Sequence, residues 1–185
     1  SWTLLGLKSV RAIPQIGRSR IVVLGFGQGG FIAALTTRRA SDLVHAVGFV
    51  GTPARALDVV LTSPALRDSI TRVRLLDTFD GIWAGTYPDT TLVLNGEAQC
   101  WRSWLQVSND MRSVVEAITQ PFLAVQGTAD TLLPALDIER YRNLLKGRSR
   151  SRVEVALGVQ HDLRDAVPDP KQDPDDISPR VVDPV

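Results

Sequence analysis

The stretch that decides the fold reads Ile21-Val22-Val23-Leu24, then Gly25-Phe26-Gly27-Gln28-Gly29-Gly30, then Phe31-Ile32-Ala33-Ala34-Leu35-Thr36-Thr37-Arg38-Arg39. The first part has four apolar residues, three of them β-branched, which predicts a short buried strand. The second part has four glycines in six positions, which is typical of a tight turn. The third part contains neither glycine nor proline and predicts a helix. A strand, a glycine-rich turn and a helix therefore follow one another directly.

The glycine turn has the frame of a Gly-x-Ser-x-Gly nucleophile elbow, in which a serine stands on a strained turn between strand and helix. Gly27 occupies the serine position, and it has no side chain that could attack a carbonyl. Gly25 and Gly29 are predicted to be the small residues that the tight turn requires on either side. The backbone N–H of Gln28 is predicted to point at a developing oxyanion near the helix N-terminus.

The same turn also fits a second interpretation, a dinucleotide-binding fingerprint. Gly25, Gly27 and Gly30 satisfy Gly-x-Gly-x-x-Gly between a strand and a helix. That fingerprint also requires a carboxylate near the end of the next strand, where it holds a ribose. The next predicted strand runs into Gly51-Thr52-Pro53, and the nearby Asp42 precedes that strand. The nucleotide interpretation is therefore the weaker alternative, and it stays open.

Two polar residues follow later predicted strands. Asp130 ends the turn after the strand at residues 121–126, and His161 ends the turn after the strand at residues 153–157. Because the carboxyl ends of parallel strands share one edge, we expect Gly27, Asp130 and His161 to converge. Two simpler interpretations stay open at this point. Asp130 could cap the helix after it, and His161 could be a solvated loop residue.

These residues follow the chain order nucleophile, acid, base. In this order and in these turns, the sequence resembles the α/β-hydrolases of the esterase, lipase and serine-peptidase type, over roughly residues 3–167. The resemblance implies that His161 is a general base and that Asp130 orients it. It also implies that the Gln28 N–H forms half of an oxyanion hole, with Gly27 in place of the nucleophile.

The fold class expected from these patterns is α/β, a parallel sheet with crossover helices of the α/β-hydrolase type. Measured against that family, the sequence appears without the N-terminal strands and the final helix. A sheet of this size is expected to expose an apolar edge and face, and to need the missing N-terminal part of its domain or another chain. The expected helices and strands are a helix at 3–14, a strand at 20–26, a helix at 28–39, strands at 46–51 and 121–126, a helix at 134–146 and a strand at 153–157.

The segment between the second and third of these strands is predicted to be a helical cap or lid over the site. Helical apolar spacing covers it, and Pro64, Gly81, Gly85 and Pro88 are predicted to break it into short pieces. The predicted domain boundaries are a hydrolase core at 1–53 and 119–167, the cap at 54–118, and a loop or tail at 168–185.

The cap contains three of the four tryptophans, Trp83, Trp101 and Trp104. One interpretation is an aromatic wall that binds an apolar substrate. The other is that at least one of them anchors the cap.

Composition limits the function classes. The chain has 185 residues, 44% of them apolar, and a net charge of +1, which suits one domain with a hydrophobic core and argues against nucleic acid as a partner. Its single cysteine, Cys100, excludes an internal disulfide and is predicted to be inert packing. The spacing of histidine, cysteine and carboxylates predicts no metal and no cofactor, and no apolar run predicts a membrane span. Localisation stays open.

The predicted function is hydrolysis of an ester, thioester or amide bond in a small acyl compound or a peptide, lost or strongly impaired because of Gly27. The alternative is a non-catalytic binding protein of the same fold. The sequence does not decide whether the glycine at position 27 is natural or engineered.

Overall fold

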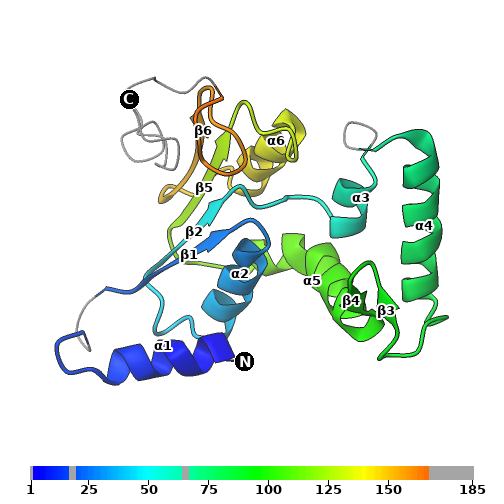
Figure 1. The fold of residues 1–185 in the computed structure, drawn as a ribbon. Coiled ribbons are helices and arrows are strands. Elements are labelled where there is room, and N and C mark those ends of the chain that lie inside the picture. Colours follow the sequence, from blue (N-terminus) through cyan, green and yellow to red (C-terminus); the bar gives the residue numbers. More distant parts are fainter. Residues whose placement is uncertain (1, 17–19, 64–66, 167–185) are drawn as a thin grey trace. The chain divides into compact units, whose positions relative to one another are not determined.

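The computed structural model describes residues 2–16, 20–63 and 67–166 (Figure 1). The chain divides into two compact units. The first consists of the chain up to Ala54 and from Arg112 onward, and the second is Arg55–Met111. The second unit lies within the predicted insertion, and the predicted tail at 168–185 lies outside the described residues. The domain boundaries themselves stay predictions.

The first unit contains a sheet of four parallel strands in the order β1-β2-β5-β6. The strands are β1 (Val22–Phe26), β2 (Ala46–Val50), β5 (Phe122–Gly127) and β6 (Ser151–Ala156). Their carboxyl ends lie at one edge, because Phe26 pairs with Val50, Val50 with Val125, and Gly127 with Ala156. This arrangement confirms the predicted parallel sheet. The last strand begins at Ser151 rather than at 153, since its pairing with β5 starts there.

Helices connect these strands, as expected for a parallel sheet. They are α2 (Gly29–Arg39), the end of α5 (Ala98–Glu116) and α6 (Ala135–Leu144), while α1 (Trp2–Ala12) precedes the first strand. The core between the sheet and α6 is aromatic. The rings of Phe49 and Phe122 meet edge to face at 4.6 Å, and Tyr141 on α6 lies 5.9 Å from Phe49. Burial of these rings attaches the helix to the middle of the sheet.

The first strand differs from the prediction of a buried strand. Val22 and Leu24 are 55% and 67% exposed, because β1 is an edge strand in the described part of the chain and one of its faces is open to solvent. The side chain of Leu24 lies against Gly48 of the neighbouring strand, and a β-carbon on Gly48 would collide with it.

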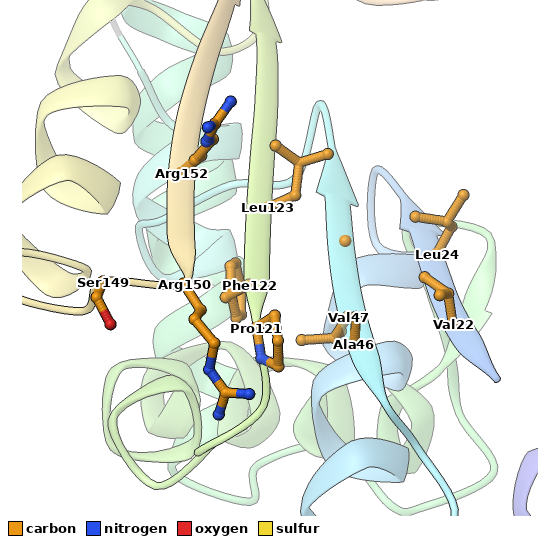
Figure 2. Close-up of a pocket in the computed structure, with 11 residues that line it drawn as sticks. Val22, Leu24, Ala46, Val47, Pro121, Phe122, Leu123, Ser149, Arg150 and Arg152 are labelled. Atoms are coloured by element: carbon orange, nitrogen blue, oxygen red, sulfur yellow. The ribbon is translucent and has the colours of Figure 1, made fainter. Parts of the chain in front are cut away.

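A groove of about 420 Å³ follows this open face at the amino-terminal half of the strands (Figure 2). The residues that line it are Val22, Leu24, Ala46, Val47, Gly48, Pro121, Phe122, Leu123, Ser149, Arg150 and Arg152.

The second unit is mostly helical, as predicted, but two of its helices are longer than the short pieces that were expected. It contains α3 (Leu57–Leu61), α4 (Ser69–Trp83) and the beginning of α5, with a buried cluster of Leu57, Phe79, Ile82 and Leu105. The expected break at Gly81 is wrong, since α4 continues through it to Trp83. Gly81 is instead a point of close approach, where a β-carbon would lie 2.7 Å from the ring of Tyr87.

A hairpin in the second unit was not predicted. The strands β3 (Leu92–Val93) and β4 (Gly96–Glu97) pair antiparallel around Leu94 and Asn95. Both turn residues have positive φ, 50° and 64°, which is the type I′ geometry of two-residue hairpins. The central positions are Leu94 and Asn95, so the Asn95-Gly96 pair, which is typical of the two central positions of such a turn, is displaced here by one residue. In the described residues no helix is both long and apolar enough to cross a membrane.

Candidate active site

The glycine turn joins β1 to α2 at the carboxyl edge of the sheet. Gly27 has a φ of +53°, a left-handed conformation that glycine adopts without strain, and its N–H donates to the carbonyl of Val50 at 2.9 Å. Gln28 is the N-cap residue of α2. The N–H groups of Gly30 and Phe31 donate to the carbonyls of Gly27 and Gln28 at 3.2 and 3.0 Å, so the first turn of α2 closes directly on Gly27.

Two glycines of the turn are required for close packing, and only one of them, Gly25, was predicted. A β-carbon on Gly25 would lie 2.5 Å from the backbone Cα of Gly30, and one on Gly30 would lie 2.5 Å from Cγ2 of Thr52. A β-carbon on Gly29 would meet nothing within 4 Å. The prediction for Gly25 is therefore confirmed. The prediction for Gly29 is wrong, because its side-chain position faces open space.

Asp130 lies in the turn after β5, and its side chain is 1% exposed. One carboxylate oxygen, Oδ1, accepts hydrogen bonds from the backbone N–H groups of Leu132 and Leu133, both at 2.9 Å. The other oxygen, Oδ2, lies 2.8 Å from Nδ1 of His161. The interpretation of Asp130 as a helix cap is wrong, because the N-cap of α6 is Pro134 and no side chain caps it. One oxygen of Asp130 holds its own loop, and the other meets the histidine.

His161 lies in the turn after β6, with its side chain 26% exposed. Its ring is 5.5 Å from the ring of Phe26, and a β-carbon on Gly51 would lie 3.4 Å from it. The opposite nitrogen, Nε2, lies 3.9 Å from the point where a β-carbon on Gly27 would stand. The turns after β1, β5 and β6 thus bring Gly27, His161 and Asp130 together.

Sequence reasoning missed Phe26 and Gly51 as neighbours of the histidine. Both stand at the carboxyl edge of the sheet, Phe26 as the last residue of β1 and Gly51 directly after β2. Their position at the ends of predicted parallel strands was the sequence signal that could have placed them near His161. A β-carbon at position 51 would stand in van der Waals contact with the imidazole, and a residue other than glycine there would be strained, since the φ of Gly51 is +56°.

The hydrogen bond to Asp130 raises the pKa of His161 above its usual value of 6.5. Partial burial of the ring opposes this increase, and the negative charges of Asp130 and Asp162 add to it. Because the folded-state pKa is the higher one, the protonated pair stabilises the fold fully below pH 6.5. That contribution is lost as the pH rises through the raised pKa.

We expect Asp130→Asn to lower the pKa of His161, because it removes the negative charge while the amide oxygen can still accept from the loop N–H groups. NMR titration of the imidazole signals measures this directly. The chain has two histidines, and His45→Gln identifies the second signal. An unchanged pKa in Asp130→Asn would contradict the assigned pairing.

All three tryptophans named above belong to the second unit. The indole Nε1 of Trp101 donates to the carbonyl of Val93 at 2.7 Å, and its ring meets Phe79 edge to face at 5.8 Å. Trp101 therefore anchors the hairpin to α5. Trp104 packs against the same buried cluster, and Trp83 is 39% exposed. A role in substrate binding stays a prediction for these residues.

We expect Trp101→Phe to destabilise the second unit by about 1–3 kcal/mol, because the partly buried carbonyl of Val93 loses its donor while the aromatic volume is largely kept. Trp83→Phe is the matched control, since Trp83 lies at the end of α4 and is more exposed. Urea unfolding followed by circular dichroism measures both. Equal midpoints for the two variants would show that the hydrogen bond has no structural weight.

Other predictions for this region can be compared with the described residues. No group of three or more histidine, cysteine, aspartate or glutamate side chains in the described residues could hold a metal ion.

Cys100 is exposed on α5, so the prediction that its side chain is buried packing is wrong. The described strands of the main sheet lie in the order β1-β2-β5-β6, which leaves the dinucleotide interpretation as a prediction.

Comparison with known proteins supports the fold alone. No protein-family model matches this chain, and no curated protein sequence matches it. Solved structures that resemble it include a monoacylglycerol lipase from Paleococcus ferrophilus, with a TM-score of 0.52 and 15% identity over 85% of this chain and 66% of the lipase. A second similar structure is an α/β fold family hydrolase from Bacillus anthracis, with a TM-score of 0.51 and 12% identity. The match covers 87% of this chain and 67% of the Bacillus anthracis protein.

A third similar structure is a 2,6-dihydroxy-pseudo-oxynicotine hydrolase, with a TM-score of 0.56 and 16% identity over 86% of this chain and 39% of that protein. The chain thus spans two thirds or less of most of these structures. At such identities the likeness concerns the path of the backbone and not the chemistry. The parallel sheet, the glycine turn after β1 and these structural neighbours together show that the chain has an α/β-hydrolase fold.

Proposed function

We propose that this chain carries an acyl-hydrolase site of the serine-hydrolase type in which glycine stands at the nucleophile position. The observation that carries the proposal is the alignment of three groups. The β-carbon position of Gly27 lies 3.9 Å from His161 Nε2, and His161 Nδ1 lies 2.8 Å from Asp130 Oδ2. A hydroxyl oxygen bonded to that β-carbon would lie about 3 Å from Nε2, within hydrogen-bond reach.

With serine at position 27, the site would perform acyl transfer. The serine oxygen would attack the carbonyl carbon of an ester, thioester or amide while His161 Nε2 takes its proton. Asp130 would keep the remaining imidazole proton on Nδ1 and stabilise the charged ring. The N–H of Gln28, at the start of α2, would donate to the oxyanion that forms.

Burial supports these roles. The Asp130 side chain is almost fully shielded from water, whereas His161 is partly exposed. A carboxylate so placed is screened little, which strengthens its hold on the imidazole. The partly exposed histidine can still meet a substrate. We assign the substrate to small acyl compounds or peptides.

The lack of a side chain at position 27 itself favours a second candidate function. A protein with this fold and with Gly27 could bind an acyl ligand without forming a covalent intermediate. The two candidates differ in what a restored serine does. A hydrolase site gains a reactive nucleophile, whereas a binding site evolved away from catalysis does not.

Covalent labelling of Gly27→Ser with a fluorophosphonate, read by intact mass, tests the proposal. We expect one adduct on the Gly27→Ser variant and none on the unaltered chain. We also expect none on Gly27→Ala, which carries a β-carbon without a hydroxyl. Adding His161→Ala to Gly27→Ser is expected to abolish labelling, since the base is removed. A folded Gly27→Ser protein that takes no label would overturn the hydrolase proposal and favour the binding protein.

A further inference from the structure

The space between Gly27 and His161 has a chemical consequence of its own. Among the described residues, and leaving out the two that adjoin Gly27, Nε2 of His161 is the one heavy atom within 4 Å of the β-carbon position of Gly27. A water molecule hydrogen-bonded to Nε2 is therefore not obstructed by a side chain at position 27. The imidazole is also partly open to solvent, so water can reach it.

We infer that this chain, with glycine at position 27, hydrolyses activated esters directly, with water as the nucleophile and His161 as its general base. This inference rests on the proposed acyl-hydrolase site but needs no serine. It assigns an activity to the chain as it stands rather than to a restored form.

The bonding of His161 favours the required tautomer. The Asp130 carboxylate accepts the proton of Nδ1, so the neutral ring carries its lone pair on Nε2, on the side of Gly27. Asp130 is itself held by Leu132 and Leu133, which limits the movement of the pair. The base is thus positioned before a substrate arrives.

The reaction balances without a further reactant. The water oxygen forms a bond to the carbonyl carbon while one water proton passes to His161 Nε2, and the carbonyl oxygen becomes an oxyanion near the Gln28 N–H. The intermediate then collapses, the bond to the leaving oxygen breaks, and the proton on Nε2 passes to that oxygen. A carboxylic acid and an alcohol are the products, and no acyl-enzyme forms.

Hydrolysis of 4-nitrophenyl acetate by the unaltered chain tests this inference. We expect His161→Ala to lower the rate by about 10²-fold, the lower range for loss of a positioned general base. His45→Ala is the matched control, because His45 is the second histidine and lies in an exposed position before β2, where its Nδ1 accepts from Ile21 N. The His45→Ala variant measures any contribution of an exposed imidazole to the rate, and we expect this variant to retain the full rate.

Three measurements on the unaltered chain keep the test independent of how well His161→Ala folds. The rate is expected to rise with pH through the pKa of His161 and to fall in D₂O, as for proton transfer to a base. Intact mass during turnover is expected to show no acetyl adduct. A rate equal in His161→Ala and His45→Ala, a rate independent of pH across that range, or an acetylated intermediate would each overturn the water mechanism.

The outcome is separable from the proposed function. If Gly27→Ser takes the fluorophosphonate label but the unaltered chain shows no His161-dependent hydrolysis, the inference fails and the acyl-hydrolase site stands. If neither is observed in folded protein, both fail. Labelling together with His161-dependent hydrolysis supports both.

Discussion

Gly25→Ala is expected to destabilise the chain by about 3 kcal/mol or more, at the upper end of the range for overpacked cores. The added β-carbon would stand 2.5 Å from the backbone Cα of Gly30, well inside van der Waals contact. Its neighbours are backbone atoms at the start of α2, which cannot rotate away as a side chain could. Relief requires the helix to separate from β1, to which it is joined by only two residues, Gly27 and Gln28. The midpoint of urea unfolding measures the effect.

Gly29→Ala is the control for this prediction, because it adds the same methyl group four residues away. Its β-carbon would meet nothing within 4 Å, and alanine favours a helix more than glycine does. We expect its midpoint to equal that of the unaltered chain or to exceed it slightly. If both variants lost stability equally, the close packing described for the turn would be wrong.

Gly27→Ser is expected to raise the rate of ester hydrolysis by about 10³-fold and to lower stability at the same time. The gain follows from a covalent nucleophile placed about 3 Å from Nε2 of His161, since removal of such a nucleophile costs at least this factor in related chemistry. The loss follows from the backbone, because a φ of +53° costs a residue with a side chain about 1–2 kcal/mol. Steady-state kinetics with 4-nitrophenyl acetate and urea unfolding measure the two effects.

Gly27→Ala separates the two causes. Its methyl group imposes the same backbone cost without supplying a nucleophile, so we expect a similar loss of stability and no gain in rate. Because the methyl group also takes part of the space beside His161, its rate is expected to fall below that of the unaltered chain. An equal rate for Gly27→Ser and Gly27→Ala would contradict the nucleophile assignment.

The local order of the chain could be predicted from the sequence, because it depends on neighbouring residues. Apolar β-branched residues before a run of glycines predicted β1 and its turn, and the proline-opened apolar stretch at 121–126 predicted β5 within one residue. The position of Asp130 and His161 after strands, and hence their placement at one sheet edge, follows from the same local patterns. These local patterns were enough to predict the fold class.

Properties that depend on residues distant in the sequence were decided by the tertiary structure alone. Gly30 rather than Gly29 is the crowded glycine because Thr52, which follows β2, packs against it. Val22 and Leu24 are the exposed residues of the exposed edge and face that were expected, because the exposure of each side chain depends on what lies beside its strand. The two roles of Asp130, and the approach of Nε2 to within 3.9 Å of the Gly27 β-carbon position, arise where three turns meet. The sequence alone determined which residues stand at that edge, and only their packing in space decided which atoms face one another.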